Sequence, residues 1–233
     1  MKPTLVFVHS PVVGPSTWAA TANMMRHKGF RCEVPDLTEV VSMGPPFYQK
    51  LAAAAARPVS GGGSVVLIGH SAAGSLLPAI ADAVPGPVRA IFVDAQLPHP
   101  GQSWFETAPA PLCAQLREMA EGDAVPRYHE WFSPRAFERA LPDAATRRRF
   151  VAELPRVPLA YFEEPAPVTR RLGRKWAYVR LSPAFDHAAD EAARRGWWVA
   201  RREWDHLRML TAPDAVADVV ARAVAATRLD GGT

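Results

Sequence analysis

The 233-residue sequence is poor in cysteine and has no long apolar run. Its two cysteines, Cys32 and Cys113, stand in no CxxC or other ligand-spaced cluster, so the sequence predicts no metal site. No segment approaches the ~20 apolar residues that a membrane span requires. The first residues lack the apolar region and cleavage site of a signal peptide. We therefore expect a cytoplasmic protein with no membrane partner.

The sequence also lacks the marks of a cofactor site and of a nucleic-acid interface. The loop after the first expected strand, residues 13–16, is not the GxGxxG fingerprint of dinucleotide-binding proteins. The net charge is +4, but the arginines form short scattered clusters such as Arg147–Arg149. A nucleic-acid interface needs a continuous basic stripe. We expect no cofactor, no nucleic-acid partner and a small-molecule substrate.

Strand and helix patterns alternate along most of the chain, whose hydrophobic content of 48% is typical of a globular protein. Short apolar runs predict strands at 4–8, 31–34, 64–68, 88–93, 176–181 and 197–202. Helical spacing predicts helices at 16–28, 47–57, 72–84, 186–195 and 214–228. This alternation predicts an α/β fold with a mostly parallel, roughly six-stranded sheet and helices on both faces.

One long segment, residues 96–173, breaks the alternation after the fourth strand. It is rich in proline and aromatic residues, and helical patterns occur near 111–121, 133–140 and 143–153. We interpret it as a helical cap inserted into a core made of residues 1–95 and 174–233. The cap should lie over the carboxyl edge of the sheet, where open α/β sheets bind ligands.

The strongest motif is Gly69-His70-Ser71-Ala72-Ala73-Gly74, between a predicted strand and a predicted helix. It closely matches the G-x-S-x-G nucleophile elbow, with Ala73 in place of the second glycine. Small residues are needed two positions before and after the serine because the turn is tight. Ser71 is therefore the predicted nucleophile, and the backbone N–H of Ala72 is a predicted oxyanion donor.

A serine nucleophile needs a base, and His206 is the best-placed histidine, just after the last predicted strand. On these residues the chain resembles compact bacterial α/β-fold hydrolases of the esterase and hydroxynitrile-lyase-like group. The resemblance extends through Asp94–Pro98 and Asp205–Leu207. It implies a serine hydrolase with a Ser-His-acid triad that acts on a small or medium ester, thioester or lactone.

The acid of that triad has more than one candidate. Relatives usually place it after the penultimate strand, where Asp186 lies nearby, and some place it after the preceding strand, where Asp94 lies. Asp94 is the preferred prediction and Asp186 the alternative. Glu163 and Glu164 are more remote possibilities.

The chain also differs from these relatives at the oxyanion hole. Relatives typically end the first strand with His-Gly-X and use the N–H of X, but this chain has His9-Ser10-Pro11, and proline has no N–H. The N–H of Val12 could substitute, as could the hydroxyl of Ser10 or Ser16. Without a second donor the same residues could serve a lyase or cyclase, or a catalytically inactive binding protein.

Polar residues at the strand ends and aromatic residues of the cap are the predicted lining of the substrate pocket. We expect His9, Ser10, Trp104 and Trp131 to line it, together with other cap aromatics such as Phe105, Phe132, Tyr161 and Phe162. Hydroxynitrile lyases of this group carry lysine directly after the base, whereas this chain carries Leu207. The resemblance therefore disfavours cyanohydrin cleavage.

Overall fold

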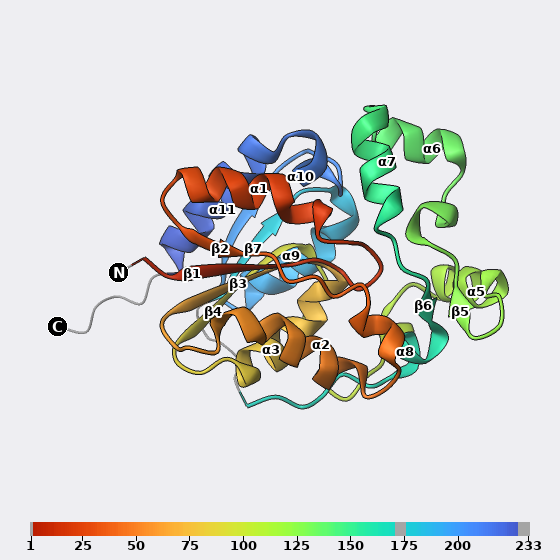
Figure 1. Ribbon diagram of the computed structural model, residues 1–233, viewed down its shortest axis with the longest axis horizontal. Coiled ribbons are helices and arrows are strands. Elements are labelled where there is room, and N and C mark those ends of the chain that lie inside the picture. Colours follow the sequence, from red (N-terminus) through yellow and green to blue (C-terminus); the bar gives the residue numbers. More distant parts are fainter. Residues whose placement is uncertain (1, 171–175, 228–233) are drawn as a thin grey trace.

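A six-stranded sheet forms the centre of the protein, whose computed structural model describes residues 2–170 and 176–227 (Figure 1). The strands are β1 (Thr4–Val8), β2 (Arg31–Glu33), β3 (Val65–Ser71), β4 (Val88–Ala95), β7 (Ala177–Arg180) and β8 (Trp198–Arg201). Their order is β2-β1-β3-β4-β7-β8, and all neighbouring pairs are parallel. The predicted mostly parallel sheet is confirmed.

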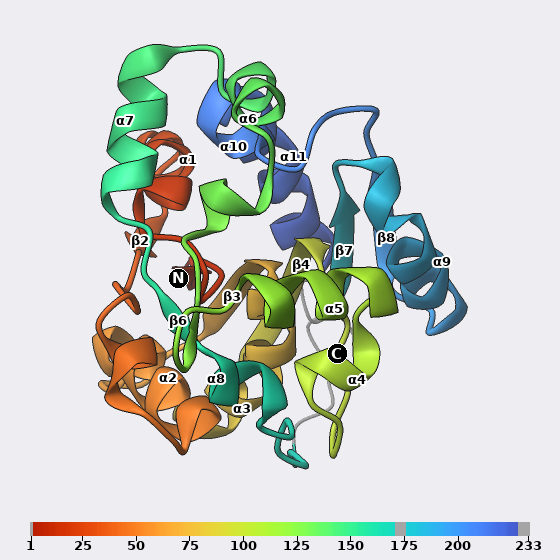
Figure 2. The same ribbon diagram turned by 90° about the vertical axis from the view of Figure 1, so that its right-hand side faces the viewer.

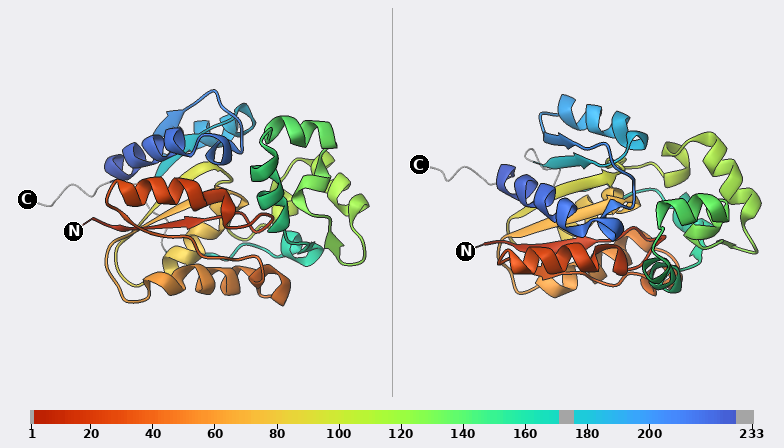
Figure 3. Two further views of the ribbon diagram at one scale, coloured as in Figure 1. Left: turned by 45° about the horizontal axis from the view of Figure 1, so that its top comes forward. Right: turned by 90° about the horizontal axis from the view of Figure 1, so that it is seen from above.

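Helices cover both faces of the sheet, as predicted (Figure 3). One face packs against α1 (Ser16–His27), α10 (Arg208–Thr211) and α11 (Pro213–Ala226). The other face packs against α2 (Phe47–Ala56), α3 (Leu77–Ala83) and α9 (Asp186–Arg194). Alternate residues of β1 point to opposite faces, so that Leu5 and Phe7 join the first core and Val6 and Val8 the second.

The elbow serine is followed by a 3₁₀ helix, and not by the continuous helix predicted for 72–84. The 3₁₀ helix spans Ala72–Leu76, and α3 begins directly after it at Leu77. Pro78 is the second residue of α3, and the backbone N–H groups of the first turn have no hydrogen-bond partner within the helix. Pro78 therefore lies in the first turn of α3 and does not interrupt a helix.

Between β4 and β7 the chain forms a separate layer beside the carboxyl ends of the strands (Figures 1 and 2). Its helices are α4 (Trp104–Thr107), α5 (Ala110–Met119), α6 (Pro134–Ala140), α7 (Ala144–Ala152) and α8 (Leu159–Glu163). An antiparallel pair, β5 (Ala124–Val125) and β6 (Val157–Pro158), was not predicted, because two-residue strands have no detectable periodicity. The expected cap boundary at residue 173 lies outside the described residues. We refer to residues 104–163 as the cap layer.

Two glutamates beside or within the cap layer bind the first turns of core helices. Glu153 accepts a 2.8 Å hydrogen bond from the Ser16 N–H at the start of α1. Glu164 accepts hydrogen bonds of 2.8 and 2.9 Å from the N–H groups of Phe47 and Tyr48 at the start of α2. A carboxylate at a helix N-terminus satisfies free donors and complements the helix dipole. These contacts fasten the cap layer to the core.

Besides the 3₁₀ helix after Ser71, three others lie in connecting segments, at Val40–Met43, Arg57–Val59 and Pro183–Phe185, and one lies in the cap layer at Tyr128–Trp131. Within residues 2–170 and 176–227, no helix has both the length and the apolar character needed to cross a bilayer.

Candidate active site

Ser71 occupies the turn between β3 and the 3₁₀ helix in a strained backbone conformation, with φ 57° and ψ −128°. Close packing surrounds the turn. A Cβ atom on Gly69 would lie 2.8 Å from Leu77 Cδ2, and one on Gly74 would overlap the Gln96 carbonyl oxygen. Ala73 is fully buried. The small residues of the motif are therefore required by the space around the turn.

His206 follows β8 and makes a 2.8 Å hydrogen bond from Nδ1 to Asp94 Oδ2. Two other rings contact its imidazole ring. The His70 ring centroid is 4.3 Å away, and the Phe185 ring is stacked nearly parallel at 5.0 Å. No described group makes a hydrogen bond to His206 Nε2, so this nitrogen is open to a reacting group.

Asp94 owes its position to an irregularity in the sheet. The register of β3 and β4 runs from His70–Val93 directly to Ser71–Ala95, so that Asp94 is left unpaired with φ 44°. A bulge of this kind re-aims a side chain at the end of a strand. The Asp94 carboxylate in this orientation is fully buried and hydrogen-bonds to His206.

Four hydrogen bonds satisfy the Asp94 carboxylate. Oδ1 accepts from the N–H groups of Leu181 (2.7 Å) and Ser182 (2.9 Å), and Oδ2 accepts from Ser182 Oγ (2.6 Å) in addition to His206. Burial alone would raise the pKa of Asp94, but these hydrogen bonds and the nearby imidazole outweigh it, and the pKa is lowered. Asp94 is therefore ionised at neutral pH.

The other candidate acids do not contact His206. Asp186 begins α9 and pairs with Arg180 Nε at 2.6 Å and with Arg201 Nη1 at 3.5 Å. Glu163 is exposed, and Glu164 binds the first turn of α2. Of the carboxylates that the sequence left open, only Asp94 is joined to His206 among the described residues, and Asp186 is paired with arginine side chains instead.

His70 is a neighbour of His206 whose contacts the sequence did not specify. It is buried, and its Nε2 lies 2.9 Å from the backbone carbonyl of His206. Burial, reinforced by the adjacent His206, holds the pKa of His70 well below its usual value, so the ring is neutral and donates to that carbonyl. Through this bond His70 fixes the backbone that carries His206. The sequence feature that could have pointed to His70 as a site residue is its position directly before Ser71 in the motif.

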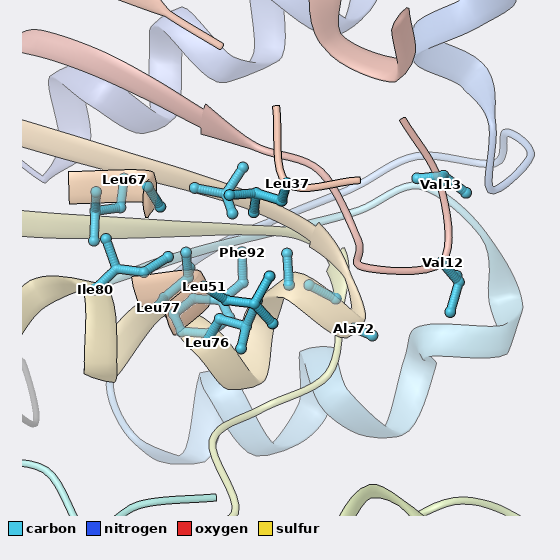
Figure 4. Close-up of a cluster of buried hydrophobic side chains, with 14 of the residues drawn as sticks. Val12, Val13, Leu37, Leu51, Leu67, Ala72, Leu76, Leu77, Ile80 and Phe92 are labelled. Atoms are coloured by element: carbon cyan, nitrogen blue, oxygen red, sulfur yellow. The ribbon is translucent and has the colours of Figure 1, made fainter. Parts of the chain in front are cut away.

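The loop after β1 contains a turn in which the Ser10 carbonyl accepts the N–H of Val13 at 3.0 Å. The Val12 N–H donates to no group in the described part of the chain, and Ala72 is the first residue of its 3₁₀ helix, where N–H groups lack helical partners. Figure 4 shows Val12 on the loop after β1 and Ala72 directly after β3, both near the carboxyl ends of these strands. The hydroxyl oxygens of Ser10 and Ser16 are buried, so neither is open to a bound substrate.

A cavity of about 170 Å³ adjoins His206. It is lined by Tyr128, Phe132, Ala136, Phe137, Ala140, Asp205, His206 and Leu207. None of the four predicted pocket residues His9, Ser10, Trp104 and Trp131 lines this cavity.

Three of those four residues have structural contacts instead. His9 is fully buried, with Nε2 accepting the Leu37 N–H at 3.0 Å and Nδ1 bonded to the Ser10 carbonyl. Trp104 packs edge-on against Phe105 and Phe162, and Trp131 Nε1 donates to the Pro126 carbonyl at 2.9 Å. Aromatic character alone therefore did not distinguish side chains that pack in the interior from side chains that line the cavity.

Among the described residues, no group of three or more His, Cys, Asp or Glu side chains could hold a metal ion.

Comparisons with known proteins bear on the family and the fold of the chain. The model of the Alpha/beta hydrolase family matches residues 5–219. No curated protein sequence matches the chain significantly.

Several solved structures share the fold. An extracellular alpha/beta-hydrolase from a Paenibacillus species superposes with a TM-score of 0.74 at 19% identity, covering 95% of this chain and 98% of its own. A pyrethroid hydrolase from Sphingobium faniae JZ-2 gives 0.68 at 17% identity, covering 97% and 98%. Polyneuridine aldehyde esterase gives 0.70 at 17% identity, covering 95% and 99%. At these identities the structural likeness establishes the fold alone.

Proposed function

Because the chain belongs to the Alpha/beta hydrolase family, we propose that it is a serine hydrolase of a small or medium ester, thioester or lactone. In this proposal Ser71 is the nucleophile, His206 the general base and Asp94 the acid of the triad. The observation that carries it is the 2.8 Å hydrogen bond between His206 and the buried, ionised Asp94, beside a strained elbow serine. Hydrolases and an esterase among the structural neighbours are consistent with this chemistry.

The proposed reaction follows from the tautomer that Asp94 selects. The carboxylate keeps the proton of His206 on Nδ1, so that Nε2 can accept the proton of the Ser71 hydroxyl. Ser71 Oγ then bonds to the carbonyl carbon, the leaving oxygen takes the proton from Nε2, and water releases the acyl group by the reverse sequence. No hydrogen bond joins Ser71 to His206 among the described residues; such contacts commonly tighten when substrate binds.

The oxyanion that forms during attack needs N–H donors, and Ala72 and Val12 are the proposed pair. Pro11 cannot donate, Val13 already donates to Ser10, and the N–H of Val12 has no partner among the described residues. Val12 therefore replaces the donor that relatives place one residue earlier.

Substitution of Val12 tests this assignment. Val12→Pro should lower kcat about 10²–10³-fold, because it removes one oxyanion donor. Val12→Ala keeps the N–H and should retain most of the activity. Steady-state hydrolysis of a p-nitrophenyl ester measures both, with thermal unfolding midpoints to show that each variant folds. Wild-type kcat in a folded Val12→Pro variant would exclude Val12 as a donor.

Pro11 also favours a second candidate, a lyase or cyclase that uses Ser71 and His206 for proton transfer without an acyl-enzyme. Such an enzyme would need no complete oxyanion hole. The two candidates differ in whether Ser71 forms a covalent bond.

Labelling with a fluorophosphonate separates the two candidates. We expect the probe to modify Ser71, since a base-activated serine attacks phosphorus as it attacks a carbonyl. Peptide mass spectrometry should locate the adduct on Ser71, and the Ser71→Ala variant should take up no label. A folded wild-type protein that stays unlabelled would contradict the hydrolase proposal and support the lyase or cyclase.

A further inference from the structure

The cavity beside His206 lies between α6 of the cap layer and the loop that follows β8. Asp205, His206 and Leu207 form its core side, and Ala136, Phe137 and Ala140 form its α6 side. Neither the elbow residues 69–74 nor the loop 9–13 contributes to its lining. The cavity therefore adjoins the proposed base and is not lined by the proposed nucleophile or oxyanion donors.

This placement identifies the part of an ester that the cavity would receive. When a serine ester intermediate forms, the bond between the carbonyl carbon and the alkoxy oxygen breaks, and that oxygen takes the proton held on His206 Nε2. The leaving alcohol must therefore lie against His206, while the carbonyl oxygen points to the N–H donors. We propose that this cavity is the subsite for the alcohol portion of the substrate, and that it takes an uncharged, apolar group about the size of one aromatic ring. This inference rests on the proposed hydrolase function.

The size limit comes from the volume of the cavity and from two alanines. An apolar cavity of roughly 150 Å³ holds one benzene molecule. The 170 Å³ found here therefore suits one six-membered ring or a branched alkyl group of similar size. Ala136 and Ala140 are four residues apart on α6 and so lie on the same face of the helix. Their small side chains leave the space that the ring would fill.

The preference for an uncharged group comes from the lining. Tyr128, Phe137 and Leu207 are buried or partly buried and present apolar surface, and Phe132 is 44% exposed, which places it at the opening. Burial raises the pKa of Tyr128 to about 12, so its ring is neutral. Asp205 is a carboxylate that already accepts the Leu207 N–H at 3.1 Å and pairs with Arg208 Nη1 at 3.8 Å. A negative charge on the bound group would meet this carboxylate in a largely apolar space.

Two isomeric esters test which portion of the substrate uses the cavity. Phenyl acetate carries its ring on the alcohol side, and methyl benzoate carries the same ring on the acyl side. The double variant Ala136→Leu/Ala140→Leu should lower kcat/KM for phenyl acetate about tenfold or more, because extra carbons in an apolar pocket exclude substrate atoms. Its kcat/KM for methyl benzoate should change much less. Ala145→Leu, on the exposed side of α7 and outside the cavity, is the matched control and should change neither value.

A binding measurement separates the subsite from the reaction. Phenol, titrated by NMR, should bind the wild-type protein and the Ala145→Leu variant alike, and the double variant about tenfold or more weakly. Unchanged phenol binding in the double variant, or an equal loss of kcat/KM for the two isomers, would overturn the subsite. If wild type hydrolyses neither ester and Ser71 takes no fluorophosphonate label, while phenol binding still weakens in the double variant, the hydrolase proposal fails and the binding site stands.

Discussion

Replacing Ser71 with alanine should lower kcat for ester hydrolysis about 10⁶-fold, the loss expected when the nucleophile of a working triad is removed. The strained turn holds the Ser71 side chain at the carboxyl edge of the sheet, and alanine fits the same turn without an attacking oxygen. The rate should be measured with a p-nitrophenyl ester on protein purified separately from the wild type, so that traces of active enzyme do not set the floor.

Ser10→Ala is a suitable control for Ser71→Ala. The Ser10 hydroxyl is buried and has no hydrogen-bond partner among the described groups, so its removal should leave kcat close to the wild-type value. The double variant Ser71→Ala/His206→Ala should be no slower than Ser71→Ala, because the base has no function without the nucleophile. An active Ser71→Ala enzyme would remove Ser71 from the reaction and leave the hydrolase proposal without its nucleophile.

The elbow and the sheet could be predicted because their signals are local. Short apolar runs, such as those within β1 and β3, specify buried strands, and the spacing from Gly69 to Gly74 reflects contacts within one turn and the helix after it. His206 was predicted as the base from its position after the last strand. These features depend on residues close together in the sequence.

The acid and the cavity depend on residues far apart in the sequence, which explains why prediction was incomplete there. Asp94 lies at the end of β4 and Asp186 lies six residues after β7, and only the register shift opposite Ser71 turns Asp94 toward His206. Asp186 instead forms an ion pair with Arg180, six residues earlier in the chain, and the sequence did not indicate this contact. The cavity forms where α6 meets the loop after β8, and of the aromatic residues that the sequence favoured as pocket lining only Phe132 lines it.

Replacing Asp94 with asparagine should lower kcat about 10⁴-fold, the usual result of this change in a Ser-His-Asp triad. Asparagine has the same shape, and its oxygen can still accept the N–H groups of Leu181 and Ser182. Its NH₂ group would face His206 Nδ1 and donate to it. That nitrogen would then have to be the acceptor, which places the imidazole proton on Nε2, where it cannot take the proton of Ser71.

Asp186→Asn is the matched control, since Asp186 is the carboxylate that the sequence could not separate from Asp94. It should keep nearly all of kcat, because Asp186 contacts Arg180 and Arg201 and not His206. Ester hydrolysis at neutral pH distinguishes the two variants directly. Equal activity of Asp94→Asn and wild type, or a collapse of activity in Asp186→Asn with its fold intact, would contradict Asp94 as the acid of the triad.

The stability of Asp94→Asn should also respond differently to acid. The folded-state pKa of Asp94 is lowered, so its ionised form stabilises the wild-type fold above the ordinary aspartate value of about 4. This contribution is lost as the pH falls through the lowered folded-state value. Asparagine has no such proton to bind, and thermal unfolding midpoints measured between neutral pH and pH 3 should therefore fall less steeply for Asp94→Asn than for wild type. If both proteins lose stability along the same curve, the hydrogen bonds of Asp94 do not favour its ionised form.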